Sequence, residues 1–75
     1  MTNRSSHPGV GIRLLRERAG LTQDEVALLM GASPTYLSRV ENGAVKASDL
    51  WLGNAASAIG SYLAEPRPLD LRGAA

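Results

Sequence analysis

The fold of this chain is decided by residues 22–43, which read TQDEVALLMGASPTYLSRVENG. Thr22 belongs to the residue types that cap helix N-termini, and Glu25 follows three positions later, so the two residues can form a capping box. An apolar run then continues until Gly31, which can end a helix because glycine adopts positive φ without a steric penalty. The pattern predicts a short helix over residues 23–30.

A second short helix is predicted directly after the first. Ser33 is a good N-cap, and Pro34 suits the first helical position, where its missing N–H leaves no hydrogen bond unmade. The pair Asn42-Gly43 can close this helix, so we expect it over residues 34–41. Two short helices joined by a tight turn that contains glycine form a helix-turn-helix pattern.

Four positions within this stretch test the pattern. Ala27 supplies a small side chain in the middle of the first helix, where two steeply crossing helices come close. Gly31 lies at the turn, where positive φ would cost a residue with a Cβ atom about 1 kcal/mol or more. Leu37 and Val40 are one turn apart and can anchor the second helix in the core. All four residue types suit a helix-turn-helix.

A helix is expected on each side of this pair. Ile12, Leu15 and Ala19 follow helical spacing before Gly20, which is placed to end that helix. The later helix begins at about Ser48. Its inward-facing residues are Leu52, Ala55, Ala56 and Ile59. Because no strand hairpin is evident, the chain is predicted to be all-α.

The chain is predicted to form one domain with a polar segment at each end. Residues 1–9 are expected to form a flexible arm. The helix-turn-helix domain is expected over residues 10–64. Residues 65–75 are predicted to be an extended or disordered tail, because Pro66 and Pro68 prevent further helix.

Three stretches resemble the phage-repressor family of helix-turn-helix proteins, the Cro/C1 or xenobiotic-response-element type. They are IRLLRERAGLTQDEVA at 12–27, GASPTYLSRVENG at 31–43 and the short segment Ala58-Ile59-Gly60, and together they extend over about residues 10–60. The resemblance implies a compact four- to five-helix bundle of the lambda-repressor-like helix-turn-helix type. It also implies a protein that binds operator DNA, commonly as a dimer.

In this family the third helix lies in the major groove, with its N-terminal residues facing the base edges. The residues that the resemblance places toward the bases are Gln23, Ser33, Pro34, Thr35, Tyr36 and Arg39. Arg39 is the only charged residue of this set, and its guanidinium can bind O6 and N7 of a guanine together. Pro34 stands where the family is frequently polar, so its contact with a base must be apolar or absent.

Thr22, Asn42 and Lys46 occupy positions that resemble phosphate contacts of the family, and Arg13 is a further candidate for the same role. Thr22, like Ser33, is first of all a helix cap, and Asn42 is first of all part of a helix-ending turn. The helix N-terminus at Gln23 can also meet a phosphate.

The family pairs an arginine of its first helix with a glutamate at the end of its third, and Arg16 and Glu41 match these positions. We expect this ion pair to be structural, because it would lock the recognition helix onto the first helix.

Two groups of residues are candidate protein-contact surfaces. Trp51, Tyr62 and Leu63 are candidates for a homodimer surface because aromatic residues are enriched at interfaces, with core filling as the alternative. Leu14 and Leu28 are expected to face solvent and, like the tail, could contact a protein partner.

Composition excludes several classes of protein. The chain has 75 residues, a net charge of +1, no cysteine and one histidine, His7, in the predicted arm. We therefore expect no disulfide, metal or cofactor. No nucleophile has a base held beside it, so an enzyme is not expected. No apolar run approaches the roughly 18 residues that span a bilayer, so we expect no membrane contact and a cytoplasmic, nucleoid-associated location.

The function predicted from the sequence is a sequence-specific DNA-binding transcriptional regulator, a repressor that occupies an inverted-repeat operator as a dimer. Two alternatives stay open. One is an antitoxin-like protein that binds both DNA and a toxin, and the other is a protein-interaction module that has lost DNA binding.

Overall fold

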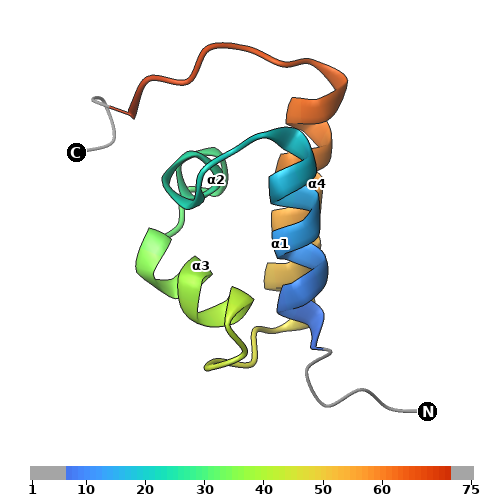
Figure 1. Cartoon of the computed structure of the whole chain (residues 1–75), viewed down its shortest axis with the longest axis vertical. Helices are drawn as coiled ribbons and strands as arrows, with labels where there is room; N and C mark the ends of the chain where they lie inside the picture. The colour runs from blue at the N-terminus through green and yellow to red at the C-terminus, as the bar shows by residue number, and fades with distance from the viewer. Residues whose placement is uncertain (1–6, 72–75) are drawn as a thin grey trace.

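The computed structural model of the chain describes residues 7–71. This part of the chain contains no strand and four helices, which are α1 (Pro8–Ala19), α2 (Gln23–Met30), α3 (Pro34–Glu41) and α4 (Asp49–Ala64). The predicted all-α helical bundle is therefore confirmed. In Figure 1, α1 and α4 lie along one side of the molecule, and α2 and α3 lie along the other.

The helix ends follow from local chemistry. The hydroxyls of Thr22, Ser33 and Ser48 accept hydrogen bonds from backbone N–H groups in the first turns of α2, α3 and α4. Gly20 ends α1 with φ 71°, and Gly31 ends α2 with φ 68°. Both angles are in the left-handed region that favours glycine. The caps and glycine turns predicted from the sequence are thus confirmed.

The helix α1 begins at Pro8, two residues earlier than the predicted boundary near residue 10. Proline at the first helical position is already held at a helical φ, so the helix can begin there. His7, the residue before it, has extended backbone. The rest of the predicted arm, residues 1–6, lies outside the described residues.

The core is built from all four helices and the turn after α1. Its buried residues are Ile12, Leu21, Val26, Leu37, Ala55 and Ile59. Leu15, expected to face inward, is instead 39% exposed. The inner side of α1 carries Gly9, Ile12 and Arg16, and this spacing turns Leu15 away from the core.

The two leucines that were expected to face solvent differ in the structure. Leu14 is 57% exposed, whereas Leu28 is half-buried.

The three residues predicted for a dimer surface also differ in their exposure to solvent. Trp51 and Tyr62 pack against the core, which is the core-filling alternative, and only Leu63 is exposed.

The segment after α4 folds back across the molecule. Residues 65–71 run from the end of α4 over α2 (Figure 1), and Leu69 packs against the core. The described part of the predicted tail is therefore extended and anchored by one apolar side chain. Residues 72–75 lie outside the described residues.

The first turn of α1 touches the last turn of α3. Gly9 is buried, and a Cβ atom at this position would overlap the backbone carbonyl group of Val40. Backbone cannot move aside as a flexible side chain can, so only glycine allows this approach. The contact fixes the end of α3 against α1.

Replacing Gly9 should therefore destabilise the protein. We expect Gly9→Ala to lower the free energy of unfolding by about 1–3 kcal/mol through overpacking. Gly11→Ala is the matched control, because a Cβ atom there meets nothing within 4 Å. It should raise the free energy of unfolding by about 0.5–1 kcal/mol through better helix propensity. Urea denaturation followed by circular dichroism measures both, and equal stability of the two variants would contradict the close contact.

Candidate nucleic-acid interface

A shallow, open groove runs between the N-terminal turn of α2 and the outer side of α3. Its volume is about 430 Å³, and it is lined by Gln23, Asp24, Pro34, Thr35, Ser38 and Arg39. Four of these six residues were predicted to face bases. The structure therefore brings together Gln23, Pro34, Thr35 and Arg39, which come from two different helices.

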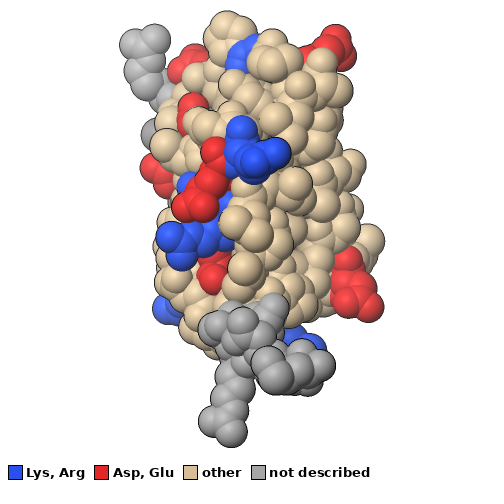
Figure 2. All heavy atoms as spheres, turned by 45° about the vertical axis from the view of Figure 1, so that its right-hand side comes forward, with Lys and Arg blue, Asp and Glu red and all other residues tan. Residues whose placement is uncertain are grey.

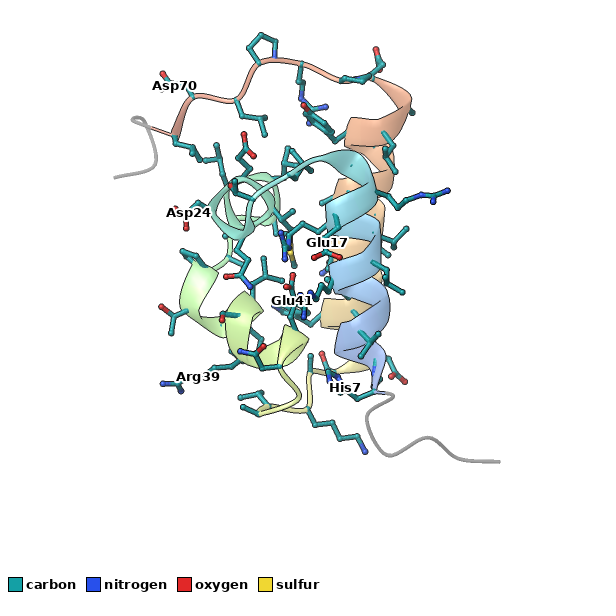
Figure 3. The ribbon with its side chains drawn as sticks, viewed as in Figure 1. His7, Glu17, Asp24, Arg39, Glu41 and Asp70 are labelled. Atoms are coloured by element: carbon teal, nitrogen blue, oxygen red, sulfur yellow. The ribbon has the colours of Figure 1, made fainter. Side chains whose placement is uncertain are left out.

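The outer side of α3 presents Arg39 to solvent. The guanidinium points away from α1 and from the body of the molecule (Figure 3). Among the described residues, Arg39 has no ion-pair partner. The two ion pairs found there join Glu17 to Arg13 and Glu41 to Arg16. A guanidinium that is held by a helix and left without a protein partner is available for a ligand with hydrogen-bond acceptors.

The side chain of Tyr36 does not line the groove. Its ring packs against Trp51 of α4, edge to face, with 5.2 Å between the ring centroids. This geometry is favourable for two aromatic rings and is worth roughly 0.5–1.5 kcal/mol beyond the buried area. Tyr36 thus joins α3 to α4, a contact that the sequence did not predict, and its contact with a base stays a prediction.

Behind the groove, α3 is held to α1 by a buried ion pair. Arg16 donates from Nε to Oε2 of Glu41 at 2.8 Å and from Nη2 to Oε1 at 2.9 Å. Its Nη1 donates to the backbone carbonyl of Leu21 at 3.0 Å. Glu41 is only 4% exposed. The hydrogen bonds to Glu41 raise the pKa of Arg16 further, so the guanidinium stays charged.

Gln23 takes part in the same cluster. Its Nε2 donates to Oε1 of Glu41 at 3.1 Å, so this carboxylate oxygen is shared by residues of α1 and α2. This hydrogen bond from Nε2 fixes the orientation of the Gln23 amide, and the amide oxygen remains available as an acceptor at the groove. The sequence contained no feature that would have predicted this bond, because it joins residues 18 positions apart.

Comparison with known proteins agrees with this arrangement. A family model described as a helix-turn-helix domain matches residues 9–66, which is more than half of the chain. The chain belongs to this helix-turn-helix domain family. Neither curated proteins nor solved structures give a match. The groove thus lies along the second helix of a helix-turn-helix domain, and proteins of this kind bind DNA through that helix.

Two groove residues of the helix-turn-helix domain were missed from the sequence. Ser38 follows Thr35 by three positions, so helical spacing alone could have placed it on the same side of α3. Asp24 follows Gln23 in the first turn of α2, where an acidic residue is favourable beside the helix dipole. Its carboxylate brings a negative charge to the groove that Arg39 also lines.

The predicted phosphate contacts are spread around the helix-turn-helix domain. Thr22 caps α2 in a capping box, and its own N–H donates to Oε1 of Glu25 at 2.8 Å. Asn42 is exposed at the C-terminal end of α3. Arg13 forms an exposed ion pair with Glu17 at 3.2 Å. None of these three residues lines the groove, although Thr22 directly precedes a residue that does.

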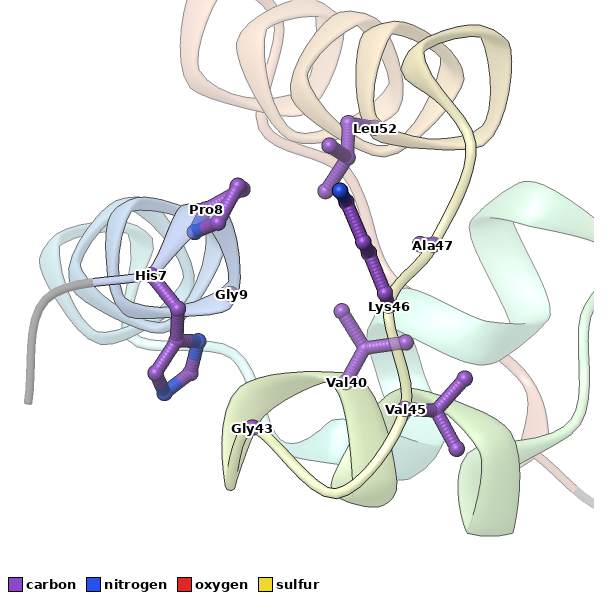
Figure 4. A pocket seen from close by; sticks show the side chains of 9 residues that line it. All are labelled: His7, Pro8, Gly9, Val40, Gly43, Val45, Lys46, Ala47 and Leu52. Atoms are coloured by element: carbon purple, nitrogen blue, oxygen red, sulfur yellow. The ribbon is translucent and has the colours of Figure 1, made fainter.

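Lys46 lies at a different pocket of about 280 Å³, between α1, the end of α3 and the start of α4 (Figure 4). Its side chain extends toward Leu52, and the imidazole of His7 lies beside Gly43 at the other side of the pocket. The predicted phosphate contact of Lys46 therefore stands apart from the groove. Most of the remaining lining is aliphatic.

Residues 7–71 contain no group of three or more histidine, cysteine or acidic side chains that could hold a metal ion. No helix among them is long and apolar enough to cross a membrane.

The buried ion pair should contribute far more to stability than the exposed one. We expect Glu41→Gln to lower the free energy of unfolding by about 3–5 kcal/mol, because Arg16 would keep a charge without a partner inside the protein. Glu17→Gln is the matched control, since it removes the partner of Arg13 at the surface and should cost less than about 0.5 kcal/mol. Chemical denaturation of the two variants tests this. Similar losses would show that Glu41 is not buried with its partner.

Proposed function

We propose that this helix-turn-helix protein is a sequence-specific transcriptional regulator of the phage-repressor type, and that it acts as a repressor. Its partner is double-stranded DNA, and α3 is the helix that enters the major groove. By occupying an operator, the chain would block access of RNA polymerase. An inverted-repeat operator would bind one copy of the chain on each half-site. We also propose that the protein is located in the cytoplasm.

The observation that carries this proposal is the arrangement of Arg39. It is exposed on the outer side of α3, while Glu41, two residues later, is buried against α1. The recognition helix therefore has one side fixed to the body of the protein and the other side presented to a ligand. Thr35, one turn before Arg39, adds a hydroxyl and a methyl group that suit a base edge.

Most of the other predicted DNA contacts are proposed to hold the protein on the DNA backbone rather than to recognise bases. The N-terminal turn of α2 borders the groove, so its free backbone N–H groups can donate hydrogen bonds to a DNA phosphate. The amide oxygen of Gln23 can accept a hydrogen bond from a donor group of a base. Thr22, Asn42, Lys46 and Arg13 are proposed to reach phosphates outside the groove. The proposal involves no cofactor and no catalysis.

The experiment that tests the proposal is selection from a random-sequence duplex pool, with the bound fraction sequenced at two salt concentrations. Enrichment of one sequence motif would support a sequence-specific regulator, and an inverted repeat would support two copies on one operator. Salt-sensitive binding without an enriched motif would contradict sequence recognition. Absence of binding at both salt concentrations would contradict the whole proposal.

Arg39 should contribute to sequence discrimination. We expect Arg39→Ala to weaken binding to the selected site by about 1–3 kcal/mol, and to weaken binding to unrelated duplex much less. Arg67→Ala removes the same charge from the exposed segment after α4 and serves as the control. Fluorescence anisotropy with both duplexes measures the four affinities. Equal losses on selected and unrelated DNA would overturn base recognition by Arg39.

Asp24 should oppose DNA binding because its carboxylate lines the same groove. We expect Asp24→Asn to raise affinity for selected and unrelated duplexes alike, roughly two- to tenfold at low salt. Asp49→Asn is the matched control, since Asp49 also lies in the first turn of a helix and loses the same helix-dipole interaction. If both variants change affinity equally, the groove is not the DNA-facing surface.

A further inference from the structure

The cavity beside Lys46 is separate from the groove that carries Arg39. It has a volume of about 280 Å³ and lies between the start of α1, the end of α3 and the segment that leads into α4 (Figure 4). None of its lining residues lines the groove. The cavity is thus formed by three parts of the chain that are distant in sequence, and the proposed base contacts leave it unused.

Two glycines keep this cavity open. Gly9 is buried where α1 meets α3, and a Cβ atom there would overlap the backbone of Val40. Gly43 has φ 78°, in the left-handed region that favours glycine, and a Cβ atom there would lie 2.9 Å from Nε2 of His7. Because neither position readily accepts a side chain, the space between them is not filled from α1 or from the turn after α3.

The walls of the cavity are aliphatic. Val40 and Ala47 are buried, and Val45 and Leu52 are half-buried. None of the described residues that line the cavity is acidic. Aliphatic walls of this kind suit the apolar body of a ligand, because apolar surface gains free energy when it is removed from water.

Two basic side chains flank these walls. Lys46 is exposed, and His7 is half-buried on the other side of the cavity (Figure 4). Among residues 7–71, neither the ammonium of Lys46 nor the imidazole of His7 has a hydrogen-bond or ion-pair partner. Both groups can donate hydrogen bonds, and the imidazole does so from one ring nitrogen even when it is neutral. The two groups therefore favour a negatively charged acceptor.

Several other basic side chains are already paired with acidic ones. Figure 2 shows basic and acidic side chains next to one another along one edge of the molecule, and in the described part of the chain Arg13 pairs with Glu17 and Arg16 with Glu41. Lys46 lacks such a partner although it follows Glu41 closely in sequence, because the Glu41 carboxylate is buried with Arg16. A carboxylate from a ligand would supply the missing partner.

We infer that this cavity binds a small organic acid with one carboxylate and a compact aliphatic body. The body lies against Val40, Ala47 and Leu52, and the carboxylate accepts hydrogen bonds from Lys46 and His7. Pockets for drug-sized ligands have roughly 300–1,000 Å³, so a cavity of about 280 Å³ limits the ligand to on the order of ten non-hydrogen atoms. A phosphate or acetate ion would use the basic groups but leave the aliphatic walls exposed to water.

The acid opposes DNA binding, and this part of the inference rests on the proposed function, in which Lys46 reaches a DNA phosphate. An ammonium that is paired with the carboxylate of a ligand no longer neutralises a phosphate. Because coupling between two sites is reciprocal, DNA in turn lowers the affinity for the acid. The cavity thus allows a small acid to release the regulator from its operator.

The test of the cavity needs no DNA. NMR spectra of the backbone amides of the full chain are recorded during titration with cyclohexanecarboxylate, with the uncharged cyclohexanecarboxamide and with acetate. We expect the acid to shift the signals of Gly9 and Gly43, which line the cavity, and to leave those of Gly20 and Gly60 unchanged. Its dissociation constant should be roughly 0.1–1 mM. The amide should bind about three- to tenfold more weakly, and acetate at least about tenfold more weakly.

The variant Lys46→Gln tests the carboxylate contact. We expect it to weaken binding of the acid about three- to tenfold, to the level of the amide, and to leave binding of the amide unchanged. Arg18→Gln is the matched control, because it removes one positive charge from an exposed position near the other end of α1 and should change neither affinity. Both substituted side chains are exposed, so the fold is kept, which circular dichroism verifies.

Three results would overturn the acid site. The first is a titration in which Gly9 and Gly43 do not shift. The second is equal affinity for acetate and cyclohexanecarboxylate, which would show that the aliphatic walls are not used. The third is equal affinity for the acid and its amide, or equal losses in Lys46→Gln and Arg18→Gln, which would show that no carboxylate contacts Lys46.

The second arm measures the coupling to DNA. Fluorescence anisotropy gives the affinity for the selected duplex in saturating cyclohexanecarboxylate and in the same concentration of acetate, which controls for ionic strength. We expect the acid to weaken DNA binding about three- to tenfold in the unchanged chain and to have no effect on Lys46→Gln. An acid that fills the cavity without changing the affinity for DNA would overturn the coupling. If no duplex is bound at all, the DNA-binding proposal and the release both fail, while the titration still decides whether the cavity binds the acid.

Discussion

The rest of the structure depends on the buried ion pair between Arg16 and Glu41. The two side chains share two hydrogen bonds, and the same cluster includes Gln23 at the start of α2 and the carbonyl of Leu21 in the turn before it. One carboxylate thus connects three helices. Removal of two charges from water is costly, but here both carboxylate oxygens of Glu41 accept hydrogen bonds, and among the described residues no buried side-chain nitrogen or oxygen is left unsatisfied.

This constraint matters because α3 has only eight residues. An isolated helix of that length is not stable in water, so its position must come from contacts with the rest of the molecule. Glu41 and the close approach of Gly9 to Val40 fix its C-terminal end, and the edge-to-face contact of Tyr36 with Trp51 fixes its N-terminal half. The side of α3 that remains carries Arg39. A small domain without a large core thereby obtains a rigid ligand-facing helix from a few specific contacts.

Much of this fold could be predicted because its determinants are local. Caps such as Thr22 and glycines such as Gly31 act within a few residues of themselves, so helix order and helix ends follow from short stretches of sequence. The ion pair was expected only through resemblance to a family. Leu15 was assigned to the wrong side, and the contact of Tyr36 with Trp51 was not predicted, since the side that a helix buries depends on where its neighbours pack, which helical spacing alone does not specify. The shared bond of Gln23 likewise exists only once α2 and α3 have been brought together.

The charges of the proposed DNA surface explain how such a protein could be selective. Arg39 and Asp24 line one groove, so their charges largely cancel for a phosphate at a distance, and the chain as a whole carries only +1. Attraction that does not depend on sequence comes mainly from phosphate neutralisation, and this surface supplies little of it. Binding must then depend on short-range contacts from Arg39 and Thr35, which form only when the base edges match. A weakly charged groove on a firmly held helix therefore favours discrimination between sites over general affinity for DNA.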